Sequence, residues 1–158
     1  CIPPSSLQAG NTAGTSVYSA TYGTRWTGQT FLASNSFTLT NIKLKLDTNG
    51  VPPVGCMVEV ALRDSTLTGL DLSLGSVSCD LVPDATTLIE IPMQPYTLSS
   101  GTYSIVIREP LADSGNFISV RISNNNPYNN GQYYTSGDSG ASWGWDTTKD
   151  AYFEVWGY

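Results

Sequence analysis

Apolar residues recur at every second position in run after run of this chain, and this spacing constrains the fold more than any other feature. Successive side chains of a β-strand point to opposite faces, so a strand with one buried face shows this period of two. An apolar period of 3.6 residues never persists for ten residues, so we expect no helix longer than one turn. The sequence therefore predicts an all-β protein.

Two of the alternating runs each contain a cysteine. The first run has Cys56, Val58, Val60 and Leu62, and the second has Leu70, Leu72 and Leu74, then Val77, Cys79 and Leu81 after Gly75. If Gly75 is the extra residue of a β-bulge, Leu62 lies opposite Leu72 and Cys56 falls opposite Cys79. We therefore expect a Cys56–Cys79 disulfide and an oxidising compartment. Two buried free thiols are the alternative.

Further alternating runs predict the remaining strands. We expect strands at residues 26–31, 36–46, 86–93, 102–109, 117–123 and 151–158. The alternation changes phase at Thr40-Asn41, which indicates a bulge or bend, and Pro92 predicts an edge position for its strand. Eight or nine short strands at regular spacing predict one antiparallel two-sheet β-sandwich of the jelly-roll type over residues 11–158.

The composition narrows the function classes. Charged residues make up 13% of the chain, about half the usual share, and a net charge of −6 provides no basic surface for nucleic acid. The chain has no histidine, so a Ser-His-Asp or Cys-His catalytic site cannot be built, and we expect no catalytic residue. No apolar run approaches the ~18 residues of a transmembrane helix. We expect a non-enzymatic extracellular or cell-surface protein.

The last third of the chain sets aromatic residues among short turns. Tyr133, Tyr134, Trp143 and Trp145 could form a platform on which sugar rings stack. The alternative is that these side chains close the core or contact a neighbouring subunit.

Three aspartates of the same region are candidate metal ligands. Asp138, Asp146 and Asp150 could hold a structural Ca²⁺, which takes carboxylate and carbonyl oxygens from loops. Solvated turn aspartates are the alternative, and we expect no other cofactor.

Residues 1–10 are interpreted as an extended N-terminal arm or tether, because Pro3-Pro4 favours extended backbone. Cys1 could carry a lipid anchor, as in bacterial lipoproteins after signal cleavage, or mark an arbitrary boundary or an intermolecular disulfide. In an assembly the arm could pair with a neighbour's sheet edge and place Ile2 and Leu7 in shallow pockets. We therefore expect self-association through this arm.

Several short segments resemble jelly-roll modules of surface proteins and phage tail proteins. The matching segments are Gln29-Thr30-Phe31, residues 39–46, Tyr96-Thr97-Leu98, residues 101–107, residues 139–143 and residues 150–155. These modules are similar to non-catalytic carbohydrate-binding modules, and the resemblance implies that fold and a surface location. Such modules often carry a Trp in the strand that matches residues 117–123, and here that strand is aliphatic.

The sequence thus supports two hypotheses of function. The first is a structural subunit of a surface fibre, appendage or virion-like assembly, because the arm, the low charge and the lack of a catalytic motif favour subunit contact. The second is a carbohydrate-binding or adhesin module that uses the region of Trp143 and Trp145.

Overall fold

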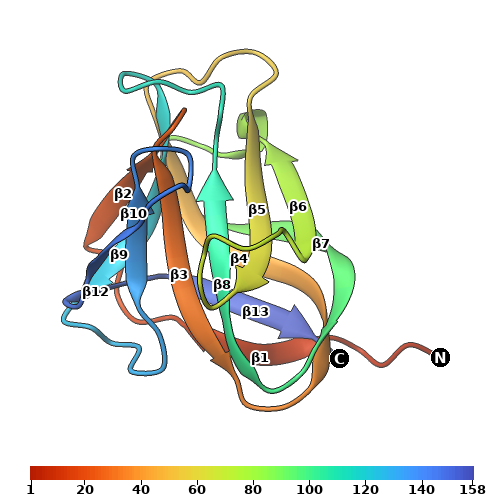
Figure 1. Ribbon diagram of the computed structural model, residues 1–158. Helices are drawn as coiled ribbons and strands as arrows, with labels where there is room; N and C mark the ends of the chain where they lie inside the picture. Colours follow the sequence, from red (N-terminus) through yellow and green to blue (C-terminus); the bar gives the residue numbers. More distant parts are fainter.

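The computed structural model describes residues 1–158 and is almost entirely β-strand (Figure 1). The strands are β1 (Ser6–Asn11), β2 (Val17–Thr21), β3 (Trp26–Ala33), β4 (Phe37–Asn49), β5 (Met57–Asp64), β6 (Ser73–Ser78), β7 (Thr87–Leu98), β8 (Gly101–Arg108), β9 (Phe117–Asn124), β10 (Tyr133–Ser136), β11 (Gly144–Asp146), β12 (Lys149–Ala151) and β13 (Phe153–Gly157). The only helix is the single 3₁₀ turn η1 (Cys79–Leu81). The prediction of an all-β chain is confirmed. No helix has the length and apolar character needed to span a membrane.

The strands form one antiparallel sheet that curls back on itself. Its order is β1-β13-β4-β7-β6-β5-β8-β3-β10-β11, and β9 pairs with β4, β2 and β12. Strand β7 keeps the sheet continuous, because it pairs with β4 along most of its length and meets β6 at Gly75 and Met93. The predicted division into two separate sheets is therefore not confirmed.

The curl encloses the main hydrophobic core, which contains 24 buried residues. The alternating apolar residues of the strands form this core, as expected. In β4, for example, Ile42, Leu44 and Leu46 are fully buried. Lys43 and Lys45 lie on the other face, where each ammonium group packs over an aromatic ring of the C-terminal residues. One face of each strand thus belongs to the core and the other to the outside.

The predicted Cys56–Cys79 disulfide is confirmed, with 5.4 Å between the two Cα atoms. The predicted bulge at Gly75 is wrong, because β5 and β6 pair without interruption and Leu62 lies opposite Ser73. Gly75 serves another purpose: a Cβ at this position would overlap the carbonyl oxygen of Pro92 on β7. Because no residue is inserted, Leu74 points to the outer face.

The bulge predicted at Thr40-Asn41 is confirmed, since the register between β4 and β7 shifts between Leu39 and Asn41. The edge position predicted from Pro92 is wrong, because β7 lies between β4 and β6. Pro92 lies opposite Asn41, beside the bulge, where the hydrogen-bonding pattern is already interrupted. A proline there removes no regular ladder bond, so an interior strand accepts it.

The N-terminal arm is shorter than expected. Residues 6–11 form β1 and pair with β13 of the same chain, so only residues 1–5 extend from the fold (Figure 1). The prediction rested on Pro3-Pro4, which lies within the extended residues and says little of residues 6–10. Pairing with an open strand edge needs backbone groups, and the small Ala9 packs against the core.

We predict that Gly75→Ala destabilises the protein by roughly 1–3 kcal/mol, because the new methyl group would push β6 away from β7. Gly137→Ala is the matched control, since no atom lies within 4 Å of a Cβ at that position. Urea unfolding of both variants measures the difference. Equal stabilities would show that the β6–β7 contact tolerates a side chain.

We also predict that replacing both bridged cysteines by serine lowers the free energy of unfolding by about 3 kcal/mol, because the unfolded chain is no longer constrained by a closed loop. The measurement is urea unfolding of Cys56→Ser/Cys79→Ser beside the wild type. Mass analysis under non-reducing conditions checks the pairing itself. Alkylation of both thiols in natively isolated protein would contradict it.

Candidate functional site on the outer face of the sheet

A row of small and apolar residues crosses the outer face of the sheet. The strand register places these residues opposite one another in the order Trp145, Tyr134, Gly28, Val106, Ala61 and Leu74. They come from the neighbouring strands β11, β10, β3, β8, β5 and β6, at outward positions of the same alternation that builds the core. We call this set the outer-face row.

Two loop residues cover the middle of the outer-face row. Leu67 from the β5–β6 loop is buried with Ala61 and Val106, and Trp143 from the β10–β11 loop packs against this cluster. A Cβ at Gly28 would lie 2.6 Å from the Leu67 side chain and 3.0 Å from the Trp143 ring, so the glycine makes room for both. Trp143 is therefore a packing residue, and its buried indole nitrogen has no hydrogen-bond partner.

One end of the outer-face row is open to solvent. Trp145 is 68% exposed and lies opposite the partly buried Tyr134 in the β10–β11 pair. The turn after it is fixed, because Asp146 accepts hydrogen bonds from the Thr148 backbone and hydroxyl and forms an ion pair of 2.8 Å with Lys149. The bonds from Lys149 and Thr148 lower the pKa of Asp146 to about 2. Trp145 is thus an exposed indole on a well-ordered hairpin.

A network of alternating charges lies beside the row. The Asp71 carboxylate joins two arginines, with 2.7 Å to Arg63 Nε and 3.0 Å to Arg108 Nη2. Arg108 Nε also lies 2.7 Å from Glu59, so the four formal charges cancel. Both guanidinium groups lie within 5.6 Å of the Trp26 ring centre, in cation–π range.

Hydrogen bonds within the network favour the charged forms of Asp71 and Arg108. Burial disfavours the ionised form of Asp71, but hydrogen bonds from Arg108 and Arg63 outweigh it and lower the pKa of Asp71. Burial likewise disfavours the charge of Arg108, yet its bonds to Asp71 and Glu59 raise the pKa of Arg108. Asp71 is therefore an acceptor and Arg108 a donor in this network.

The other end of the outer-face row borders a shallow depression of about 260 Å³. It is lined by Glu59, Leu74, Gly75, Ser76, Gln94 and Arg108. A carboxylate, a guanidinium, a hydroxyl and an amide thus surround one leucine that is 36% exposed. Donors and acceptors without net charge suit a neutral, hydroxylated ligand better than an ion.

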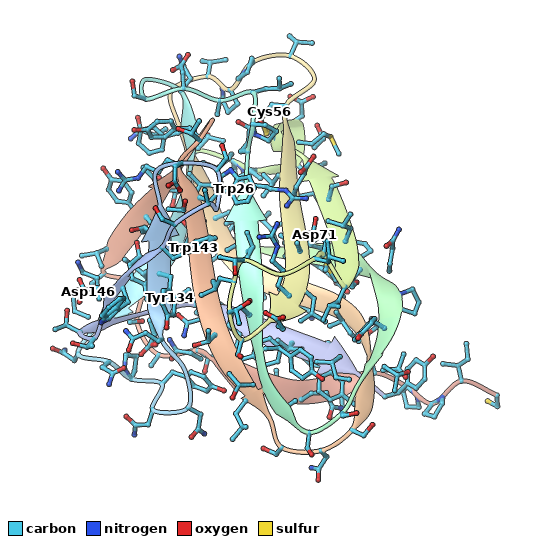
Figure 2. The ribbon with its side chains drawn as sticks, in the orientation of Figure 1. Trp26, Cys56, Asp71, Tyr134, Trp143 and Asp146 are labelled. Carbon is cyan, nitrogen blue, oxygen red and sulfur yellow. A yellow bond between two sulfur atoms is a disulfide. The ribbon has the colours of Figure 1, made fainter.

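The structure separates the predicted aromatic platform into different roles. Tyr133 is buried and its hydroxyl donates to Ser19 at 2.7 Å, so it belongs to the interior. Trp143 covers the outer-face row, and Trp26, Trp143 and Tyr134 lie near one another in Figure 2. Of the four predicted residues, only Trp145 is largely open to solvent.

The three predicted calcium ligands do not form one site. Asp138 binds Ser136 and Ser142 in its own loop, and these bonds lower its pKa to about 2. Asp146 belongs to the next turn, and Asp150 is fully buried in a separate position. The only group of three Cys, Asp or Glu residues close enough to hold a metal ion lies elsewhere, at the disulfide.

Sequence reasoning missed the residues of the charged network and depression. Arg63 and Arg108 stand at outward positions of strands whose inner face is apolar, and this signal could have marked them as neighbours on one face. Trp26 was recognised only as the start of a strand. Asp71 lies in the β5–β6 loop, eight residues from Arg63, and its contact with Arg108 of β8 depends on long-range pairing.

No protein family and no curated protein matches this chain. The function must therefore be argued from the geometry of the outer face.

We predict that Asp150→Asn becomes progressively more stable relative to the wild type as the pH rises. Burial raises the pKa of Asp150, although hydrogen bonds from Tyr128 and Gln29 oppose the shift. The folded wild type therefore holds its proton to higher pH than the unfolded chain, and loses stability as the pH rises from the unfolded pKa through the folded one. Urea unfolding of both proteins at several pH values measures this. A pH-independent difference would contradict it.

Proposed function

We propose that this chain is a non-catalytic carbohydrate-binding module of the jelly-roll kind, acting on a cell, virus or other extracellular surface. The observation that carries the proposal is Trp145, whose indole is 68% exposed on a fixed hairpin. A large aromatic side chain left in solvent at an ordered position is a typical contact for a flat, partly apolar ligand.

A pyranose ring fits the chemistry of this face. Its apolar face can stack on the Trp145 indole, while its hydroxyls both donate and accept hydrogen bonds. Asp146 and Lys149 beside Trp145 offer an acceptor and a donor that already form an ion pair. The depression at the opposite end of the outer-face row offers a second acceptor and a second donor, Glu59 and Arg108.

The two open ends are far enough apart to contact different units of one chain. Five strand spacings separate β11 from β6, which is roughly 24 Å along the sheet at ~4.8 Å per strand. Since Leu67 and Trp143 cover the middle, a ligand that reaches both ends would be an oligosaccharide lying across the strands.

We predict that Trp145→Ala weakens binding to a polysaccharide about tenfold, the effect of losing roughly 1.4 kcal/mol of stacking. Native gels that contain β-glucan, xylan, mannan or chitosan measure retardation. Tyr18→Ala is the matched control, because Tyr18 is an aromatic residue 50% exposed outside the outer-face row. No retardation by any polysaccharide, or equal losses in both variants, would sink the proposal.

A second function is favoured by a separate observation at the N-terminal side. Residues 1–5 extend beyond the fold, and Ile2 is 72% exposed (Figure 1). Strand β1 ends the sheet and carries no charged residue that would discourage pairing with another strand. These features support a structural subunit of a surface fibre, appendage or virion-like assembly that self-associates through this segment.

Deletion of residues 1–5 tests the assembly function. Under that hypothesis the full chain forms higher-order particles, and the truncated chain is a folded monomer with unchanged far-ultraviolet circular dichroism. Light scattering after size exclusion and electron microscopy distinguish the two. If the full chain stays monomeric at high concentration, or if the truncated chain assembles as before, self-association through residues 1–5 is contradicted.

A further inference from the structure

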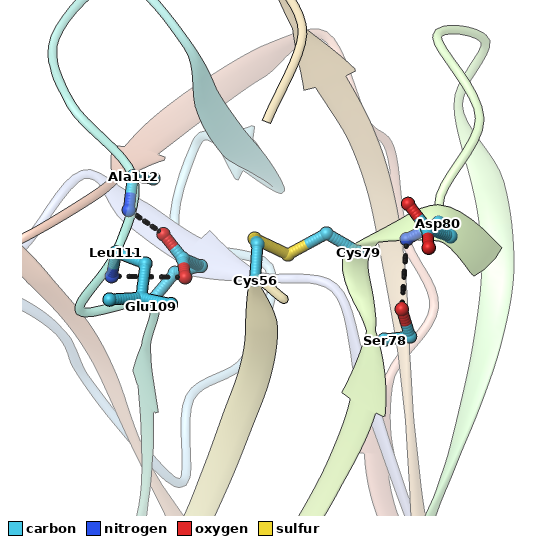
Figure 3. Close-up of a disulfide and its surroundings, with 7 residues drawn as sticks. All are labelled: Cys56, Ser78, Cys79, Asp80, Glu109, Leu111 and Ala112. Atoms are coloured by element: carbon cyan, nitrogen blue, oxygen red, sulfur yellow. Dashed lines mark hydrogen bonds between the residues drawn. A yellow bond between two sulfur atoms is a disulfide. The ribbon is translucent and has the colours of Figure 1, made fainter. Parts of the chain in front are cut away.

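A buried group of three potential metal ligands lies at the loop end of the domain. Cys56 precedes β5, Cys79 begins η1, and Glu109 follows β8 (Figure 3). All three side chains are buried, and the two sulfur atoms and one carboxylate oxygen lie within 4.8 Å of one another. Segments far apart in the sequence thus place an S, S, O donor set at one point.

Glu109 is the unusual member of this group. It is fully buried, yet no lysine or arginine forms an ion pair with it. Its carboxylate accepts hydrogen bonds from the backbone nitrogens of Leu111, at 3.1 Å, and Ala112. Two bonds occupy only part of the acceptor capacity of a carboxylate, so an oxygen lone pair stays available toward the sulfurs. An unpaired buried carboxylate is costly, and a cation would offset that cost.

We propose that reduction of the disulfide turns this group into a zinc site. Two molecules of a thiol reductant supply two electrons and two protons, become a disulfide themselves, and leave Cys56 and Cys79 as thiols. Zn²⁺ then displaces the two thiol protons to solvent and binds both thiolates and the Glu109 carboxylate. A water molecule supplies the fourth ligand of the tetrahedron.

The donor set selects the metal. Two thiolates favour zinc over magnesium or calcium, and a carboxylate oxygen is an accepted third zinc ligand. The movement required is small: the sulfurs need to separate to about 3.8 Å, the edge of a tetrahedron with ~2.3 Å zinc–sulfur bonds. The neighbouring turn is already fixed, because Ser78 accepts a hydrogen bond from the backbone nitrogen of Asp80 at 3.3 Å (Figure 3).

The site would keep the start of β5 joined to η1 in both redox states. In the oxidised protein the link is the covalent bond, and in the reduced protein it is the metal. This inference does not depend on the ligand of the outer face, because none of the three side chains lines the depression or the outer-face row.

Cobalt(II) is the spectroscopic probe for the test. The protein is reduced with a phosphine, which takes up the oxygen of one water molecule and leaves two thiols, and Co²⁺ is then titrated in. We expect one equivalent to bind with an intense sulfur-to-cobalt charge-transfer band, and Zn²⁺ to displace it. The oxidised protein should show no such band. Absence of the band in folded, reduced protein would overturn the proposal.

Glu109→Gln tests the third ligand. It keeps both sulfurs, and we expect Zn²⁺ affinity to fall at least about tenfold, since even residues that only support a ligand cost that much. Glu90→Gln is the matched control, because Glu90 is an exposed glutamate of β7 outside this group. Unchanged affinity in Glu109→Gln would overturn the three-ligand site.

Thermal unfolding covers the case in which reduction itself loosens the fold. Zn²⁺ should raise the melting temperature of the reduced wild type, or restore its native circular dichroism, and leave the oxidised protein unaffected. A reduced chain that Zn²⁺ neither stabilises nor refolds would equally overturn the proposal.

Discussion

The backbone contact between β6 and β7 is the constraint on which the curl of the sheet depends. At this point β7, already paired with β4, reaches β6 through the single pair of Gly75 and Met93. Glycine permits that approach because any side chain at position 75 would overlap the Pro92 carbonyl. A sheet that turns back at one bridge keeps its hydrogen bonds while its two halves enclose a core.

On the opposite side, backbone pairing between β2 and β3 is limited to the bridge of Tyr22 and Arg25, and buried polar side chains join the two halves. Thr27 of β3 exchanges hydroxyl hydrogen bonds with Ser19 and Thr21 of β2. Gln29 donates to the Asp150 carboxylate and accepts from the backbone of Ala151. Buried groups of this kind stabilise a fold only when each finds its partner, so they fix how the halves meet at that side. The buried Asp150 carboxylate thus takes part in this contact, where it accepts hydrogen bonds from Gln29 and the Tyr128 backbone.

The sequence predicts features that depend on one strand or on neighbouring strands. It does not predict contacts between segments that are far apart in the chain. Alternation within one strand decides which residues face inward, so the main core strands and the bulge beside Thr40 could be predicted, whereas β1 and the short strands β10 to β12 were not. The cysteine pair is correct although the bulge at Gly75 from which it was predicted is absent, because β5 and β6 pair in one unbroken register. The role of Gly75 could not be predicted, because it depends on Pro92, which reaches it only through the curl. The same holds for the candidate site, where Asp71 of the β5–β6 loop meets Arg108 of β8 and no local pattern brings the two segments together.

The alternation that fills the core also decides which residues lie on the outer face. The free energy of burying apolar side chains then decides which of these residues stay exposed. An apolar row on the outside would cost free energy if left in water, so Leu67 and Trp143 cover its centre, and only the two ends stay accessible. The polar groups at those ends stand on strands whose inner residues already secure the fold. Changes in Trp145, or in the lining side chains Ser76 and Gln94, would therefore alter the outer surface without disturbing the core. The side chains of such a face can change while the fold stays constant.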